Sequence, residues 1–166
     1  HHQVGLLLKP AAADGSVPQT IKRFHFHNNM SGDGGGKAIA QMLANPQMAC
    51  LTDLRFSGTR AGRDASLAVA SALKNNSMIT KLDLADNAFF KEGGEALAVA
   101  IKTMPNLRHL SLRDGSLENG AVVALGHAIA AVCPPLVHLD LSGNELGADP
   151  EDEGEDGCVE NSAAFA

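Results

Sequence analysis

The glycine-rich segment Gly32–Lys37 is the stretch of this sequence that most suggests phosphate chemistry, since backbone amides of such loops can cradle phosphate oxygens. It lacks the GxxxxGK[ST] spacing, however, and the hydroxyl that would bind Mg²⁺. Glycines also stand at Gly62, Gly93 and Gly120, at equivalent places in the repeating pattern described below. We therefore predict a structural loop that leads into a helix, and no direct nucleotide binding.

Histidines are the other side chains whose spacing could serve chemistry. His25 and His27 are two residues apart and share one face of a predicted strand, while His109 and His138 hold equivalent positions in two later strands. Imidazole binds zinc, but no adjacent carboxylate or thiolate completes a ligand set. The sequence also contains no nucleophile-elbow, phosphate-loop or zinc signature. We predict exposed polar histidines, no metal, no cofactor and no catalytic site of the protein's own.

The elements that position these residues follow an apolar pattern, apolar-x-x-apolar-x-apolar, which recurs five times. The copies start at Ile21, Leu51, Ile79, Leu107 and Leu136, so successive starts are 30, 28, 28 and 29 residues apart. Alternate residues of a strand point to the same side, so each copy predicts one short strand per layer, with its apolar residues turned inward. Together with the position discussed next, this pattern resembles the LxxLxLxxN signature of leucine-rich repeats.

The third position after each strand's last apolar residue should close the turn that follows. It holds Asn29, Thr59, Asn87, Gly115 and Asn144. An asparagine there can hydrogen-bond backbone groups that a buried turn would otherwise leave unpaired. Threonine can do part of this, but glycine cannot. We therefore predict a locally altered turn in the fourth repeat.

Apolar residues nine, ten and fourteen positions after that site predict a helix with one buried stripe in each repeat. The stripes are Ala38, Ile39 and Leu43; Ala68, Val69 and Leu73; Ala96, Leu97 and Ile101; and Ala124, Leu125 and Ile129. Strands alternating with helices at this period predict an α/β leucine-rich repeat solenoid, or horseshoe, of the ribonuclease-inhibitor-like class. The parallel sheet is expected on the concave side and the helices on the convex side.

The pattern divides the chain into three parts. Residues 1–20 are expected to be the end of a preceding repeat and a loop, and residues 21–148 four complete repeats and the start of a fifth. Residues 149–166 begin with a run of acidic residues and are expected to form a loop and a partial helix. Since neither end supplies a clear polar cap, we interpret the chain as a piece of a longer protein.

The composition of the chain limits the kinds of partner and the compartment that we expect. The formal net charge of −6 disfavours nucleic acid, which requires a basic face, and suits a basic protein partner better. No apolar run is long enough to span a membrane, so no membrane insertion is predicted. The three cysteines are an odd number without CxxC spacing, which indicates a reducing compartment and hence a cytoplasmic protein.

What remains is a surface formed by the outward residues of the strands. They are Arg23, His25 and His27; Asp53, Arg55 and Ser57; Lys81, Asp83 and Ala85; His109, Ser111 and Arg113; and His138, Asp140 and Ser142. In a horseshoe these positions line the usual binding face. We predict that Asp53, Arg55, Asp83 and Arg113, with Asp86 beyond the third strand, contact a protein partner.

Two segments point to a particular family. Phe26–Gly35 reads FHNNMSGDGG and Leu54–Gly62 reads LRFSGTRAG, and both resemble adjacent repeats of the Ran GTPase-activating proteins, especially the plant and algal form. Lys81–Asn87, which reads KLDLADN, is similar to the next repeat of that family. The likeness extends over about residues 20–145, but the family's earlier repeats are missing from this chain.

This resemblance implies a regulatory protein that binds the GTP-bound form of the small GTPase Ran and accelerates hydrolysis in nucleocytoplasmic transport. The family inserts no arginine finger; it orders the catalytic glutamine of Ran, with help from a loop asparagine. The matching residue is Asn28 or Asn29, of which Asn28 is favoured as the surface member. Arg60 is a second candidate. The resemblance also implies a location at the nuclear envelope.

The alternative is a leucine-rich repeat scaffold or sensor domain that binds other proteins without activating a GTPase. The repeat pattern alone does not separate the two hypotheses.

Overall fold

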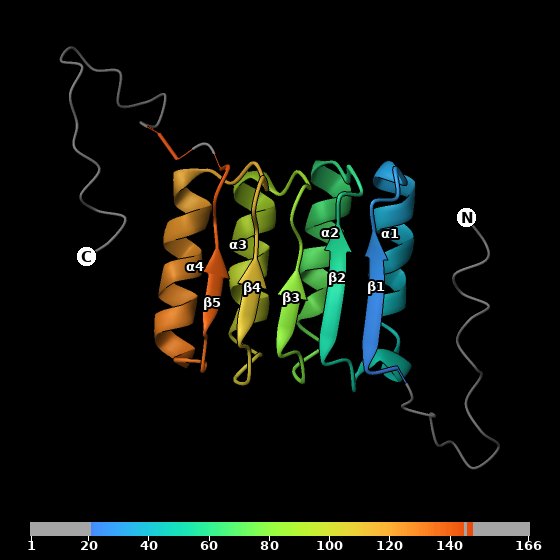
Figure 1. The fold of residues 1–166 in the computed structure, drawn as a ribbon, viewed down its shortest axis with the longest axis horizontal. Helices are drawn as coiled ribbons and strands as arrows, with labels where there is room; N and C mark the ends of the chain where they lie inside the picture. Colours follow the sequence, from blue (N-terminus) through green and yellow to red (C-terminus); the bar gives the residue numbers. More distant parts are fainter. Residues whose placement is uncertain (1–20, 145, 148–166) are drawn as a thin grey trace.

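The structure is a computed structural model that describes residues 21–144 and 146–147. Strands and helices alternate along this part of the chain (Figure 1). In order they are β1 (Arg23–His27), α1 (Gly32–Leu43), the 3-10 helix η2 (Pro46–Met48), β2 (Asp53–Ser57), α2 (Arg63–Leu73), β3 (Lys81–Asp83), α3 (Phe90–Ile101), β4 (His109–Ser111), α4 (Asn119–Val132) and β5 (His138–Asp140). The predictions for residues 1–20 and 149–166 lie outside the described residues.

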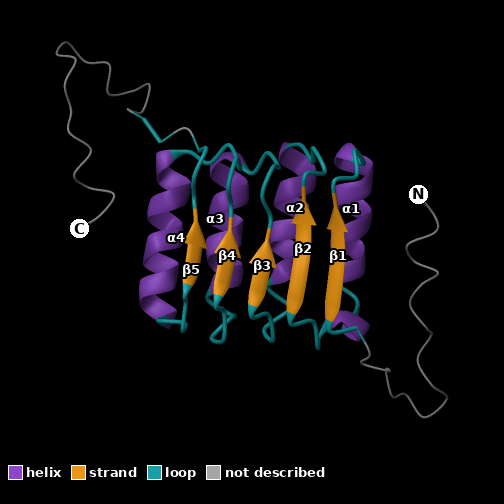
Figure 2. Cartoon of the chain, viewed as in Figure 1, coloured by secondary structure: helices purple, strands orange, loops and turns teal. Residues whose placement is uncertain are grey.

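The strands form one open, parallel sheet in the order β1-β2-β3-β4-β5. Pairing joins equivalent positions of successive repeats, so that Leu54 lies beside Leu82, Leu82 beside Leu110, and Leu110 beside Leu139. The helices α1 to α4 all cover the same face of the sheet, and the other face is left open (Figures 1 and 2). This arrangement confirms the predicted α/β solenoid with one strand and one helix per layer.

Leucines from the strands form the core between sheet and helices. In the central layers Leu54, Leu82 and Leu110 are each at most 1% exposed, as are the apolar residues two positions beyond them. In the last described strand, by contrast, Leu139 is 44% exposed, and Phe24 in the first strand is half-buried. The end layers are less buried because each has a neighbouring layer on one side only within the described residues.

The helices bury the predicted stripe, with Leu43, Leu73 and Ile101 fully buried. Two glycines allow adjacent helices to approach closely. A Cβ added to Gly36 would lie 2.6 Å from the Cβ of Ala65, and one added to Gly94 would lie 2.4 Å from that of Ala121. The glycine-rich segment thus serves helix packing. Within the described part of the chain, no helix is long and apolar enough to cross a membrane.

In the turn after every strand, the residue just before the predicted asparagine position has a left-handed backbone. These residues are Asn28, Gly58, Asp86, Asp114 and Gly143, with φ between 49° and 71°. Asparagine, aspartate and glycine are the residues that tolerate this conformation best. The backbone N–H of each of the first four donates to a carbonyl oxygen of the next layer, for example Asn28 to Ser57 at 2.9 Å. The turns therefore join the layers along one edge of the sheet.

The asparagine side chain of a turn reaches back to the preceding layer. The amide nitrogen of Asn87, a residue only 4% exposed, donates to the carbonyl oxygen of Phe56 at 2.8 Å, and its amide oxygen accepts from Ala61 N–H at 3.3 Å. Asn144 makes the equivalent bonds to the fourth layer. Thr59 was expected to bond its own turn, but its hydroxyl donates to the Asn87 amide oxygen at 2.7 Å instead.

The altered turn predicted for the fourth repeat is present. Ser116, directly after Gly115, is a second left-handed residue with a φ of 51°. The same alteration occurs at Arg60, with a φ of 54°, directly after Thr59. The role of Asn29 as the structural asparagine of its turn stays a prediction. Asn29 is exposed, but such an asparagine bonds to the preceding layer, and no layer precedes the first repeat within the described residues.

Candidate protein-binding face

The open face of the sheet carries two hollows, one near each end of the strands. The first, which we call the rim hollow, lies toward the C-terminal ends of the strands and has a volume of about 350 Å³. It is lined by His27, Asn28, Arg55, Ser57, Asp83, Ala85, Asp86, Ser111 and Arg113. Five of the eight residues predicted to meet a partner therefore lie together here: Asn28, Arg55, Asp83, Asp86 and Arg113.

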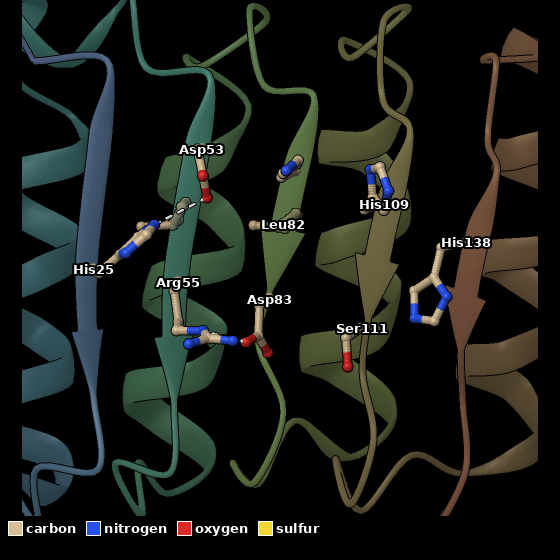
Figure 3. Close-up of a pocket in the computed structure, with 10 residues that line it drawn as sticks. His25, Asp53, Arg55, Leu82, Asp83, His109, Ser111 and His138 are labelled. Carbon is tan, nitrogen blue, oxygen red and sulfur yellow. Dashed lines mark hydrogen bonds and ion pairs between the residues drawn. The ribbon is translucent and has the colours of Figure 1, made fainter.

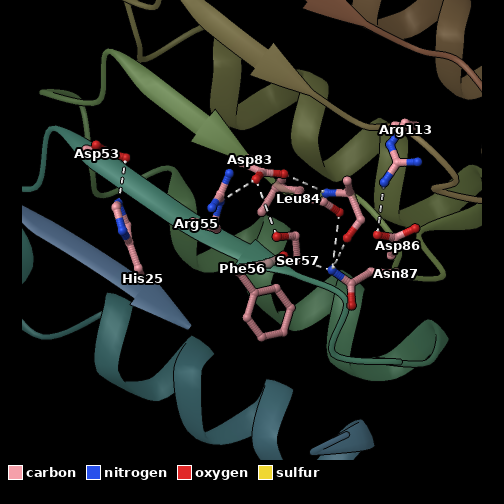
Figure 4. Close-up of polar contacts among 11 residues, drawn as sticks. His25, Asp53, Arg55, Phe56, Ser57, Asp83, Leu84, Asp86, Asn87 and Arg113 are labelled. Carbon is pink, nitrogen blue, oxygen red and sulfur yellow. Dashed lines mark hydrogen bonds and ion pairs between the residues drawn. The ribbon is translucent and has the colours of Figure 1, made fainter. Parts of the chain in front are cut away.

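Ion pairs hold the two arginines of the rim hollow in place (Figure 4). The Arg55 Nε atom donates to Asp83 Oδ2 at 2.7 Å, and Asp83 also accepts from the Ser57 hydroxyl and the Ala85 backbone N–H. Arg113 contacts Asp86 through Nη2 at 3.2 Å and Asp114 through Nη1 at 3.1 Å. Such half-exposed pairs contribute at most about 1 kcal/mol each to stability. Their effect here is to orient the guanidinium groups, which favours recognition of a partner's polar groups.

Asn28 lies at the end of β1, where its backbone is left-handed with a φ of 53°. A Cβ on the neighbouring Gly58 would lie 2.6 Å from the Asn28 Oδ1 atom, so glycine at that position leaves room for the Asn28 amide. Asn29 is also exposed but does not line the hollow. The structure thus brings Asn28, rather than Asn29, together with Arg55 and Asp83.

The other predicted residues lie apart from the rim hollow. Arg60 is exposed on the turn after β2 and lines neither hollow. Asp53 lies at the opposite end of β2, where its Oδ1 atom is 3.1 Å from His25 Nε2. The eight candidates therefore do not form a single cluster.

The second hollow, which we call the histidine hollow, lies toward the N-terminal ends of the strands (Figure 3) and has a volume of about 420 Å³. It is lined by His25, Asp53, Leu54, Arg55, Lys81, Leu82, Asp83, His109, Ser111 and His138. The ring centroids of His109 and His138 are 6.1 Å apart, and the Nδ1 atom of His109 is buried without a hydrogen-bond partner in the described structure. The prediction of exposed histidines is confirmed for His25 and His138, whereas His109 is half-buried between its neighbours in the sheet.

On this face, one carboxyl group, that of Asp140, has a pKa clearly below its ordinary value. Hydrogen bonds from the Ser142 hydroxyl and backbone N–H lower the pKa of Asp140, and His138 and Arg113 act in the same direction more weakly. Asp140 thus remains negatively charged near His138. Among the described residues, no group of three or more His, Cys, Asp or Glu side chains could hold a metal ion.

Comparisons with known proteins agree with the geometry of the layers. The leucine-rich repeat family model matches residues 75–98 and 132–149. A human protein named "NACHT, LRR and PYD domains-containing protein 13" is 28% identical over 131 residues, which are 79% of this chain and 12% of the relative. The chain therefore spans about an eighth of that relative's length. Its open parallel sheet, its regular layers and the matched repeats show that this chain has the α/β fold of a leucine-rich repeat solenoid, a fold that suggests binding of protein partners.

Proposed function

We propose that this chain is the repeat domain of a protein that activates the small GTPase Ran by binding its GTP form at the rim hollow. The observation that carries the proposal is the gathering of Asn28, Arg55, Asp83, Asp86 and Arg113 in that hollow. Asn28 and Arg55 belong to the two segments that resemble the Ran GTPase-activating proteins. The remaining three come from the neighbouring third and fourth layers.

In this proposal the domain has no catalytic site of its own. The amide of Asn28 contacts the GTPase and helps to order the glutamine that positions the attacking water. Arg55 and Arg113, which are oriented by their aspartates, fix the orientation of the partner. Positioning of this kind can change a rate strongly, because a misplacement of about 1 Å can reduce it by about 10²-fold. The proposed setting is the cytoplasm, including the nuclear envelope.

Single-turnover hydrolysis of GTP by Ran, with the full-length protein that carries this domain, tests the proposal. We expect stimulation that falls by about 10²-fold in the Asn28→Ala plus Asn29→Ala variant. The matched control is Asn75→Ala plus Asn106→Ala, which removes two exposed asparagines outside both hollows and should keep full stimulation. Absence of stimulation by the wild type would reject the activator function; equal stimulation by both double variants would reject the site.

A scaffold or sensor domain is the second candidate, and the likeness to the NACHT, LRR and PYD domains-containing protein favours it. In that case the same face binds a protein without any effect on GTP hydrolysis. Arg55→Ala and Arg113→Ala would then weaken capture of the partner while Ran hydrolysis stays at its intrinsic rate.

A further inference from the structure

We propose that the histidine hollow binds an acidic segment of a protein partner, with Lys81, His109 and His138 as its principal contacts. The proposal goes beyond Ran activation and does not depend on it, since these three residues lie outside the rim hollow. Strands β3, β4 and β5 place them side by side: Lys81 pairs in register with His109, and His109 with His138.

The carboxylates of this hollow are already engaged within the domain. Asp53 contacts His25 Nε2 at 3.1 Å, and Asp83 accepts hydrogen bonds from Arg55, Ser57 and the Ala85 backbone. Neither carboxylate is therefore well placed to attract a basic side chain from a partner.

Donor groups, in contrast, remain unused on the described residues. Lys81 is exposed, and its ammonium group forms no ion pair within the described part of the chain. The His109 ring is half-buried, and its Nδ1 atom, which has no hydrogen-bond partner there, is turned away from the surface. Arg55 uses its Nε atom for Asp83, and its two terminal nitrogens form no hydrogen bond among the described residues (Figure 3). Carboxylates accept hydrogen bonds from such groups, and charge-assisted bonds of this kind are about twice as strong as neutral ones.

The formal charge of the described repeats also favours an acidic partner. The described residues include 12 Lys and Arg against 10 Asp and Glu, a formal charge of +2 with histidine neutral, whereas the whole chain carries −6. The described repeats therefore lack the negative charge on which the expectation of a basic partner was based. The hollow itself adds three histidines. Imidazole is the side chain that in general can change its charge near neutral pH.

A bound carboxylate should consequently favour protonated imidazoles, and binding should tighten as the pH falls. The charged groups that face His109 and His138 are Lys81 on β3 and Asp140 on β5. Asp53 and Arg55 of β2 lie across the hollow, beside His25 of β1.

Fluorescein-labelled hexaglutamate is a suitable probe, with hexaglutamine as the uncharged control peptide. Binding to the full chain would be measured by fluorescence anisotropy at pH 7.5 and pH 6.0. We expect tighter binding at pH 6.0, a ~3- to 5-fold weaker affinity for Lys81→Gln, and no change for Lys102→Gln. Lys102 is a matched control because it is an exposed lysine at the end of α3, outside the hollow.

The double variant His109→Gln plus His138→Gln should abolish most of the pH dependence. NMR signals of the histidine rings provide an independent readout. Titration with hexaglutamate should shift the signals of His109 and His138, while His127, exposed on α4, stays unchanged. Equal weakening by Lys81→Gln and Lys102→Gln, or unshifted His109 and His138 signals, would overturn the proposal.

The chain's own acidic run offers the same chemistry, so one experiment must separate the two sources. In that variant Asp149, Glu151, Asp152, Glu153, Glu155 and Asp156 are replaced by Asn or Gln. Unchanged affinity for hexaglutamate would support an external partner. Affinity that rises several-fold would show that the chain's own segment competes for the hollow, and would overturn the assignment to a partner.

Discussion

The turns that follow β3 and β4 occupy equivalent positions in their layers but are stabilised in different ways. After β3, the buried Asn87 side chain bonds three carbonyl oxygens, one of them in the preceding layer, and accepts from Thr59 and Ala61. After β4, Gly115 contributes no side chain, and Ser116 adopts a second left-handed conformation. Asparagine at this position therefore serves two layers, whereas its replacement changes the path of the local backbone.

The same two turns also support the rim hollow. Asp86, in the rim hollow, directly precedes Asn87, and Asp114, which contacts Arg113, directly precedes Gly115. The two turns hold the carboxylates between which the Arg113 guanidinium lies. Variants in these turns thus test stability and the geometry of the rim together.

The largest effect is expected for Asn87→Ala. The change leaves the Phe56 carbonyl oxygen, the Ala61 N–H and the Thr59 hydroxyl without their partner in a buried region. Each unsatisfied buried group costs about 1–3 kcal/mol, so we expect a loss of about 3–5 kcal/mol in the free energy of unfolding. Urea denaturation followed by circular dichroism would measure it. A loss below ~1 kcal/mol would mean that the turn does not depend on this side chain.

The next largest loss of stability is expected for Gly115→Asn, although this substitution restores the residue typical of the repeat. A Cβ at position 115 would lie 2.8 Å from the Leu112 carbonyl oxygen and 3.3 Å from Asn144 Oδ1. Relief of such a contact by backbone movement typically costs about 1–3 kcal/mol. The same denaturation experiment, with Gly115→Ala as the control for the Cβ alone, would measure the loss. A gain in stability would show instead that the fourth turn accepts the ordinary asparagine geometry.

A smaller loss, about 1–2 kcal/mol, is expected for Asn144→Ala. This asparagine makes the same kind of bonds as Asn87, to the Leu112 carbonyl oxygen and the Gly115 N–H, but it is half-buried. Water can therefore replace part of what is lost. Thermal unfolding of this variant and of Asn87→Ala under identical conditions would check the order. Equal losses at the two positions would contradict the role of burial.

The smallest expected effect is a gain in the stability of the domain. Ser116 has a φ of 51°, a conformation that glycine adopts without strain. We expect Ser116→Gly to stabilise the domain by about 0.5–1 kcal/mol, after the entropy that glycine adds to the unfolded chain is subtracted. Ser77→Gly is the control, because Ser77 is exposed and has no left-handed backbone. If both substitutions destabilise equally, the second left-handed residue stores no strain.

Much of the fold follows from local pattern. The five apolar copies located the strands, and the stripes at fixed offsets located the helices, because each layer repeats the same periodic burial. The site was less predictable. The repeat pattern predicts Asn29 as a structural asparagine, but the bonds of such a residue go to a preceding layer, which the local pattern does not specify. The grouping of Asn28 with Arg113 likewise depends on layers that are distant along the chain.

In the histidine hollow, too, the local pattern predicts positions but not the contacts between neighbouring strands. Sequence spacing put His109 and His138 in one column, but it did not reveal that Asp53 and Asp83 are bound to other side chains. Which charges remain unpaired is decided by side-chain geometry across neighbouring strands. Net charge alone therefore predicts a basic partner, whereas the unpaired groups of this hollow lead to the proposal of an acidic one.

The strict order of the sheet has a mechanical consequence. Within the described residues, strand contacts strand and helix contacts helix only between consecutive layers, so the domain resembles a stack of coupled plates without any long-range tie. In a stack of this kind each layer is stabilised only by its immediate neighbours. A ligand that reached from β1 across to β5 would brace the stack, because it would join layers that do not otherwise touch.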